Sequence, residues 1–140
     1  MTATTRDDIA NLLSRWCWAM DDRDLEAVAA CWADDAVLHT TLPGREPQTV
    51  QGRDAIVGRL AAAWERMPPA GVHHILTTLL VEQADSETAT VRTCTVSLRL
   101  RDGAPAFSSL GTHRDVLVKV DGDWRIRVRE QTVEGWTAAS

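Results

Sequence analysis

Residues 107–133 read FSSLGTHRDVLVKVDGDWRIRVREQTV, and this stretch decides the class of fold. Apolar and polar side chains alternate over 107–120 and again over 123–133, which is the period of a β-strand. The dipeptide Asp121-Gly122 between the two segments favours a tight hairpin turn. We therefore predict a long antiparallel hairpin at the C-terminal end of the chain.

Two upstream segments have the same period and extend the predicted sheet. Val72–Ala84 and Ala89–Arg101 are strand candidates, and Asp102-Gly103 provides a second hairpin turn. Four long strands joined in this way predict an up-and-down antiparallel sheet. We expect these strands to bend strongly, because flat long sheets pack poorly on helices.

The first half of the chain has a helical period instead. The apolar positions 9, 12, 13, 16 and 20 form one face of a helix that we expect to be capped by Thr5. A short helix from about Asp24 and a third helix over Arg53–Arg66 follow, with short strands expected at Ala36–Thr41 and Thr49–Gln51. These elements predict an α+β domain with three N-terminal helices packed on a curved, mainly antiparallel sheet. Such a sheet leaves an apolar hollow suited to a small ligand.

Length, charge and cysteine content exclude several classes of protein. The 140 residues correspond to a single domain, 1–140. The net charge of -5, with basic residues scattered along the chain, excludes a nucleic-acid partner. No run of 18 apolar residues predicts a membrane span, and the N-terminus lacks the apolar segment of a secretory signal. Cys17, Cys31 and Cys94 have no metal-binding spacing, so we expect reduced, mostly buried thiols in a cytoplasmic protein.

Histidine and aspartate are the candidate groups for chemistry. His73 and His74 are adjacent, so on a regular strand only one of them can face the hollow, and alternation alone does not decide which. Asp21 lies at the end of the first helix, on the flank of its apolar face, where it is either a solvated acid or a carboxylate at the edge of the hollow. The chain has no tyrosine, no glycine-rich phosphate loop, no dinucleotide motif and no HExxH spacing. We therefore predict acid–base chemistry without a cofactor or a metal.

The last hairpin contributes further polar side chains. A two-residue turn at Asp121-Gly122 pairs Leu117 with Ile126 and His113 with Glu130. In this register one face carries His113, Asp115 and Leu117, and the other face carries the basic side chains Arg125, Arg127 and Arg129. We expect the basic face to form a homodimer interface.

Several motifs resemble those of SnoaL-like domains in the nuclear transport factor 2-like superfamily. They are residues 13–25 (LSRWCWAMDDRDL), 32–37 (WADDAV), 52–56 (GRDAI), 111–115 (GTHRD) and 120–126 (VDGDWRI). The resemblance covers nearly the whole chain and implies a cone-shaped α+β barrel, usually a dimer or trimer. Similar members include scytalone dehydratase, lindane dehydrochlorinase and bile acid 7α-dehydratase.

The resemblance also implies roles for individual residues. These enzymes pair an Asp after the first helix with a His on the first long strand, and these positions correspond to Asp21 and His74 here. The dehydrochlorinase has an Arg five residues after a Trp of the last strand, which corresponds to Arg129, and His113 falls where scytalone dehydratase has a pocket Asn. The hairpin register puts Arg129 and His113 on opposite faces, so either a bulge intervenes or one assignment is wrong. The pocket tyrosines and the second catalytic His of scytalone dehydratase are absent.

These observations favour a cofactor-free lyase of dehydratase type, or an isomerase, acting on a small hydrophobic metabolite. His74 is predicted to be the base, Asp21 its orienting carboxylate, and His113 or Arg129 the group that stabilises a developing oxyanion. The predicted substrate-binding residues are Trp16, Trp32, Trp64, Asp115 and Leu117. The alternatives are a polyketide cyclase or epoxide hydrolase on the same fold, and a non-catalytic domain for ligand binding or dimerisation. A hydrogen bond between Asp21 and His74 inside a pocket would favour catalysis over binding.

Overall fold

The computed structural model describes residues 1–67 and 71–137 of the chain. The helices are α1 (Ala3–Asp22), α2 (Leu25–Ala30) and α3 (Arg53–Arg66), and the strands are β1 (Trp32–Thr41), β2 (Gln48–Gln51), β3 (Val72–Ala84), β4 (Thr88–Arg101), β5 (Ala104–Val120) and β6 (Asp123–Trp136). The predicted α+β architecture is confirmed. The prolines Pro68 and Pro69, expected to separate its two halves, lie outside the described residues.

Capping residues define where α1 begins and ends and where α2 begins. Thr2 caps α1 and accepts the backbone N–H of Thr5, so the expected cap at Thr5 is wrong by one turn. Arg23 ends α1 in the left-handed conformation, at φ 54°. The carboxylate of Asp24 then accepts the N–H of Ala27 and begins α2, as predicted.

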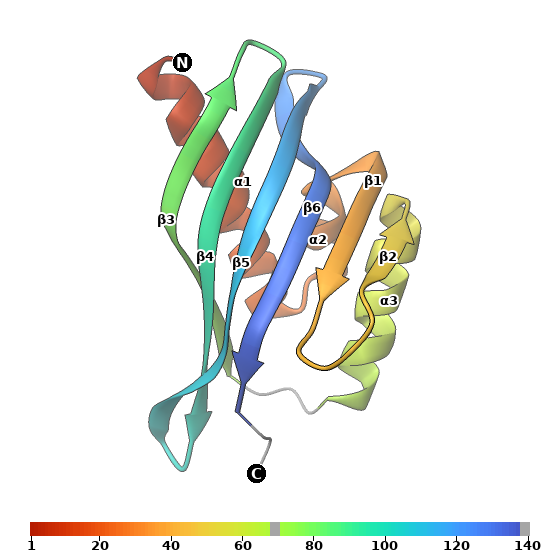
Figure 1. Cartoon of the computed structure of the whole chain (residues 1–140), viewed down its shortest axis with the longest axis vertical. Helices are drawn as coiled ribbons and strands as arrows, with labels where there is room; N and C mark the ends of the chain where they lie inside the picture. Colours follow the sequence, from red (N-terminus) through yellow and green to blue (C-terminus); the bar gives the residue numbers. More distant parts are fainter. Residues whose placement is uncertain (68–70, 138–140) are drawn as a thin grey trace.

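The strands form one curved sheet in the order β2-β1-β6-β5-β4-β3 (Figure 1). Neighbouring strands are antiparallel except for β1 and β6, which are parallel. Both predicted hairpin turns are present, with positive φ at Asp102-Gly103 and at Asp121-Gly122. Strand β1 is longer than predicted and begins at Trp32 instead of Ala36.

Helix α1 packs on the concave face of the sheet, behind β3, β4 and β5 in Figure 1. The core lies between them, because the apolar stripe of α1 faces the inward side chains of the long strands. Its fully buried members come from both layers and include Ile9, Leu12, Val91, Leu117 and Ile126.

The last hairpin contains a β-bulge that corrects the predicted register. Leu117 pairs with Ile126 as expected, but Val116 pairs with Val128, so Arg127 is an extra residue in β6. From Val116 to Gly111 the pairs are shifted by one residue from the predicted register. Asp115 therefore lies opposite Arg129, and His113 lies opposite Gln131 instead of Glu130. Arg129 consequently points into the core with His113 and Asp115, and not to the outer face.

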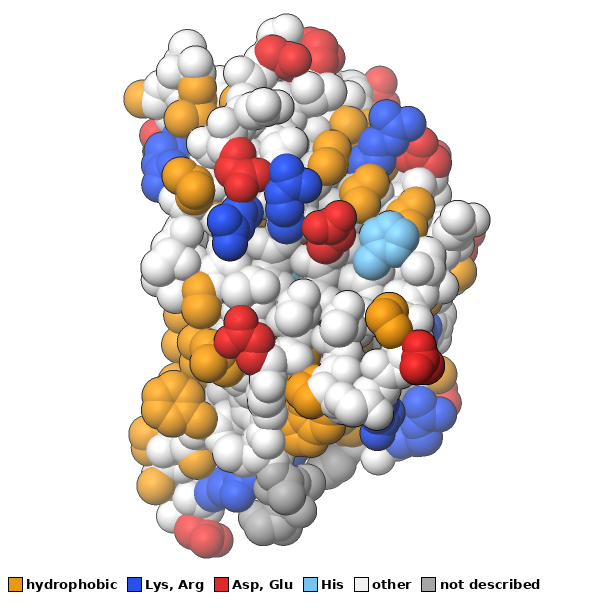
Figure 2. Space-filling view, viewed as in Figure 1, with side chains coloured by type: hydrophobic (Ala, Val, Ile, Leu, Met, Phe, Trp, Pro, Cys, Tyr) orange, Lys and Arg blue, Asp and Glu red, His pale blue; other side chains and the backbone are white. Residues whose placement is uncertain are grey.

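The outer face of the sheet is mixed in character. Figure 2 shows charged side chains over its upper half and apolar side chains gathered near the hairpin between β4 and β5. Exposed apolar side chains of that region include Phe107 and Leu110. Arg127 forms an ion pair with Asp35 on this face, whereas Arg129 is buried and contributes nothing to the expected basic interface. The homodimer or homotrimer therefore stays a prediction.

Within residues 1–67 and 71–137 we find no helix with the length and apolar character that a membrane crossing requires. The three cysteines are free, and Cys17 and Cys31 are buried as predicted. That residues 1–140 form a single domain stays a prediction.

Candidate functional site

Asp21 and His74 meet at the junction of α1 and β3. The Asp21 Oδ1 atom lies 2.7 Å from His74 Nδ1 and accepts the backbone N–H of His74 at 2.9 Å. The Asp21 side chain is only 9% exposed, although it is the penultimate residue of a helix. This double contact holds the imidazole through its Nδ1 atom and leaves the opposite ring nitrogen, Nε2, available for chemistry.

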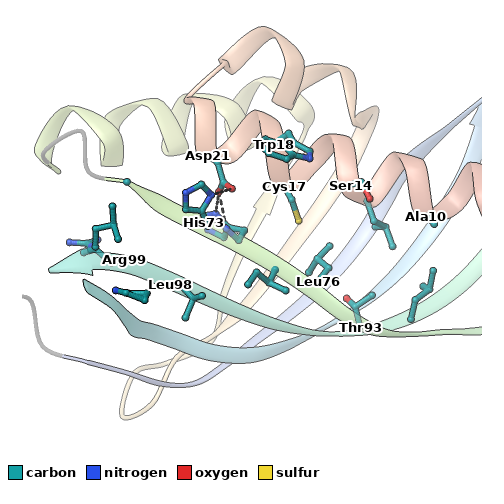
Figure 3. Close-up of a pocket in the computed structure, with 17 residues that line it drawn as sticks. Ala10, Ser14, Cys17, Trp18, Asp21, His73, Leu76, Thr93, Leu98 and Arg99 are labelled. Atoms are coloured by element: carbon teal, nitrogen blue, oxygen red, sulfur yellow. Dashed lines mark hydrogen bonds and ion pairs between the residues drawn. The ribbon is translucent and has the colours of Figure 1, made fainter. Parts of the chain in front are cut away.

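The neighbouring histidine shares the same carboxylate from the side of the solvent. His73 Nδ1 lies 3.4 Å from Asp21 Oδ2, and the His73 side chain is 61% exposed, compared with 24% for His74. Figure 3 shows Asp21 reaching from α1 toward His73 and the neighbouring part of β3. The more buried His74 is therefore the histidine that the surrounding protein shields from water.

Asp21 and His74, which we call the dyad, lie on the wall of a cavity of about 590 Å³ between α1, β3 and β4. One wall is a stripe of α1 with helical spacing, formed by Ala10, Ser14, Cys17, Trp18 and Asp21 (Figure 3). The opposite wall comes from the long strands and includes Leu76, Leu79, Leu98, Thr93 and Arg99. A mainly apolar hollow with a few polar groups is typical of a small-molecule site.

A buried ion pair lies in the core next to this site and contacts it through Trp16. Arg129 Nε and Nη2 donate to the two carboxylate oxygens of Asp115, each at 2.8 Å, and both side chains are 0% exposed. The Arg129 guanidinium carbon lies 4.3 Å from the centre of the Trp16 ring, in a cation–π contact. Trp16 packs edge-on against His74 and His113, with ring centres 5.7 and 5.4 Å apart. Arg129 therefore contacts the dyad through Trp16 and lies outside the cavity lining.

His113 is held uncharged in the interior. Burial lowers the pKa of His113 well below its ordinary value, and the positive charge of Arg129 and then His74 lower it further. Among the residues that the structure describes, its Nδ1 atom has no hydrogen-bond partner, and the same is true of the Thr93 hydroxyl on the adjacent strand. Thr93 lines the cavity, so an unused donor lies at the cavity wall next to a neutral imidazole.

The lowered pKa of His113 predicts acid sensitivity. Below the unfolded value of 6.5, the unfolded chain binds a proton that the folded chain does not bind at this residue. Above about pH 6.5, His113 therefore does not lower the free energy of unfolding. Below about pH 6.5, it lowers the free energy of unfolding by about 1.4 kcal/mol per pH unit. In urea unfolding between pH 7.5 and 5, we expect His113→Gln to remove this slope. The exposed His39 gives the matched control, His39→Gln, and equal slopes in both variants would contradict the prediction.

Cys17 lines the cavity but is a poor nucleophile. Burial raises the pKa of its thiol to about 11; the positive charge of Arg129 opposes this effect, and the negative charge of Asp21 adds to it. At pH 8 about one thiol in a thousand is then ionised. With Cys31 and Cys94 replaced by Ser, we expect native Cys17 to react with a disulfide reagent at least about 100-fold more slowly than in the unfolded chain. Similar rates in the two states would contradict the raised pKa.

The structure separates the predicted site residues into three groups. Asp21 and His74 line the cavity, whereas Trp16, His113, Asp115 and Arg129 form the buried layer beneath it. The remaining predicted residues lie elsewhere: Trp32 packs near Arg129, Trp64 contacts Arg23 and Leu117 is in the core.

Apart from Asp21 and His74, the residues that line the cavity were not predicted as site residues, and Trp18, Thr93 and Arg99 are among those that were missed. For Trp18 a signal existed, because positions 10, 14, 17, 18 and 21 form one stripe on a helix. Among the described residues, no group of three or more His, Cys, Asp or Glu side chains could hold a metal ion.

Comparison with known proteins identifies the class. A protein from Catenulispora acidiphila, solved in complex with S-DNPA, has 26% identity and a TM-score of 0.79, covering 95% of this chain and 96% of its own. An NTF2-like protein with a cystatin-like fold from Novosphingobium aromaticivorans has 25% identity and a TM-score of 0.77, covering 95% and 84%. A protein of unknown function from Mycobacterium tuberculosis has 25% identity and a TM-score of 0.78, covering 94% and 72%. A search of curated proteins found no match.

The helices on a curved sheet, with a hollow between them, define an NTF2-like protein of cystatin-like fold. The sequence pattern of the SnoaL-like domain matches residues 1–130. The chain therefore belongs to the SnoaL-like domain family, and the predicted resemblance is confirmed.

Proposed function

We propose that this chain is a cofactor-free acid–base enzyme that acts on a small hydrophobic metabolite, as a lyase of dehydratase type or as an isomerase. The observation that carries the proposal is the 2.7 Å contact between Asp21 Oδ1 and His74 Nδ1 at the wall of a mainly apolar cavity. This distance is within the range of a positioned general base and its orienting carboxylate. The relative solved in complex with S-DNPA supports a ligand-binding role for the fold.

The proposed reaction begins with proton transfer from carbon. Nδ1–H of His74 donates to Asp21, so Nε2 carries the lone pair that takes the proton. The electrons of the broken C–H bond form a new double bond. In an elimination, the imidazolium returns the proton to the leaving hydroxyl, which departs as water. In an isomerisation, it returns the proton to a different carbon of the substrate.

Side chains at the cavity wall and in the layer beneath it are proposed to stabilise the charge that develops in this step. Asp21 stabilises the imidazolium through its ionised carboxylate. The Thr93 hydroxyl, which is buried and unpartnered among the described residues, can donate to a developing oxyanion, and the neutral His113 beside it accepts or donates in turn. Arg129, which contacts Trp16 and not the cavity, is assigned a positioning role.

The test is a screen of hydroxylated and halogenated cyclic compounds with the purified protein, following loss of substrate and formation of the double bond. Turnover that needs both His74 and Asp21 supports the enzyme. Saturable binding without turnover would replace this proposal with a ligand-binding domain. We retain a homodimer or homotrimer in the cytoplasm as the expected state of the protein.

A further inference from the structure

Arg99 is a cation at the mouth of the cavity that lacks a partner in the described part of the chain. It lies near the end of β4 and lines the cavity at the end opposite Thr93 (Figure 3). Its Nε atom is buried and makes no hydrogen bond to any residue that the structure describes. A guanidinium nitrogen shielded from water without an acceptor is costly, so the site lacks an acceptor that a ligand can supply.

Within residues 1–67 and 71–137, the cavity lining offers Arg99 no free carboxylate. Among the described residues that line it, Asp21 is the only acid, and its oxygens contact His74 and His73. A guanidinium group presents Nε–H and a terminal N–H side by side, which matches the two oxygens of a carboxylate.

We propose that Arg99 binds the carboxylate of the substrate, so that the ligand of this cavity is an apolar organic acid. This proposal rests on the proposed function and narrows its substrate class. The cavity suits the apolar part of such a molecule, because Trp18, Ile75 and Leu100 line it and are 64%, 43% and 57% exposed. Exposed apolar side chains of this size in a cavity mouth indicate a contact surface for a ligand.

The strand register sets the distance between the acid and the reacting carbon. Arg99 pairs with Val72 and Ser97 pairs with His74, so Arg99 lies two residues along the strands from the proposed base. Two residues of strand span about 7 Å. The proposed substrate therefore spans from the Arg99 side of the cavity to the base two residues along the sheet.

The experiment measures binding and not turnover, so that its failure differs from failure of the enzyme proposal. Calorimetric titration compares 2-naphthoate with the uncharged 2-naphthamide on the full chain. We expect the acid to bind about tenfold or more tightly, and this preference to vanish in Arg99→Gln. Arg99→Lys keeps the positive charge but loses the paired N–H donors of the guanidinium group, so it should keep part of the preference for the acid. Arg92→Gln is the matched control, because Arg92 is on the same strand, 59% exposed and near Glu82.

Each outcome decides the proposal. Preference for the acid that depends on Arg99, with unchanged thermal unfolding of the variant, supports it. Equal binding of acid and amide, a preference that survives in Arg99→Gln, or no binding of either compound at millimolar concentration overturns it.

Discussion

His74→Ala is expected to lower kcat on a substrate found by screening by about 100-fold or more, because positioned proton transfer contributes factors of this size. The fold should survive, since His74 lies at the cavity wall and is not part of the core. The measurement is steady-state turnover together with thermal unfolding. His39→Ala is the matched control, because His39 is an exposed histidine that contacts Thr49 outside the cavity.

Asp21→Asn tests whether the two residues act as a unit. The amide keeps the shape of the carboxylate but removes the charge that stabilises the imidazolium, so we expect a loss of similar size. If Asp21 acts only through His74, the double variant should lose little more than His74→Ala alone. If the loss of turnover in the double variant equals the product of the two single losses, Asp21 acts independently of His74. Full activity of His74→Ala would remove the dyad from the mechanism.

The long strands were predictable because their signals are local. Alternation of side chains sets the strand, and the Asp-Gly dipeptides set the turns through their positive φ angles. The helix Arg53–Arg66 was also predicted with the bounds it has in the structure. The start of β1 was missed, because Trp32 pairs with Ile126 of β6 and a register shift that no local pattern indicates separates this pair from Val37–Val128.

The bulge at Arg127 was not predictable from alternation. Arg125, Arg127 and Arg129 alternate with Ile126 and Val128 as in a regular strand, so the sequence pattern continues unbroken through the extra residue. Only the resemblance, which placed Arg129 in the pocket, conflicted with the regular register. In the structure, burial of Arg129 opposite Asp115 resolves this conflict in favour of the bulge.

The dyad and the rest of the cavity differ in the sequence signals that could have predicted them. Asp21 and His74 lie 53 residues apart and were brought together only by the resemblance, because strand parity could not choose between His73 and His74. Arg99 had no signal, since one arginine near the end of a strand is usually solvated. Its place in the cavity depends on the curvature of the sheet.

Asp115→Asn is expected to lower the free energy of unfolding by about 3–5 kcal/mol. The substitution leaves the Arg129 charge buried without its counterion, and uncompensated charges in a protein interior are among the most costly defects. Urea unfolding at neutral pH measures the loss. The matched control is Asp35→Asn on β1, which removes the acid from the exposed pair with Arg127, two residues before Arg129 on β6. This change should cost at most about 1 kcal/mol.

A double variant of the Asp115–Arg129 pair distinguishes its effect on stability from its effect on turnover. Replacing both partners, Asp115→Leu with Arg129→Met, removes the buried charges together and should recover most of the lost stability. Activity should stay low, because Trp16 loses the guanidinium on which its ring rests and no longer holds His74 and His113 in place. A double variant that regains full turnover with its stability would show that the pair only fills the core. Lost turnover with restored stability would identify Arg129 as a positioning residue that acts on the base through Trp16.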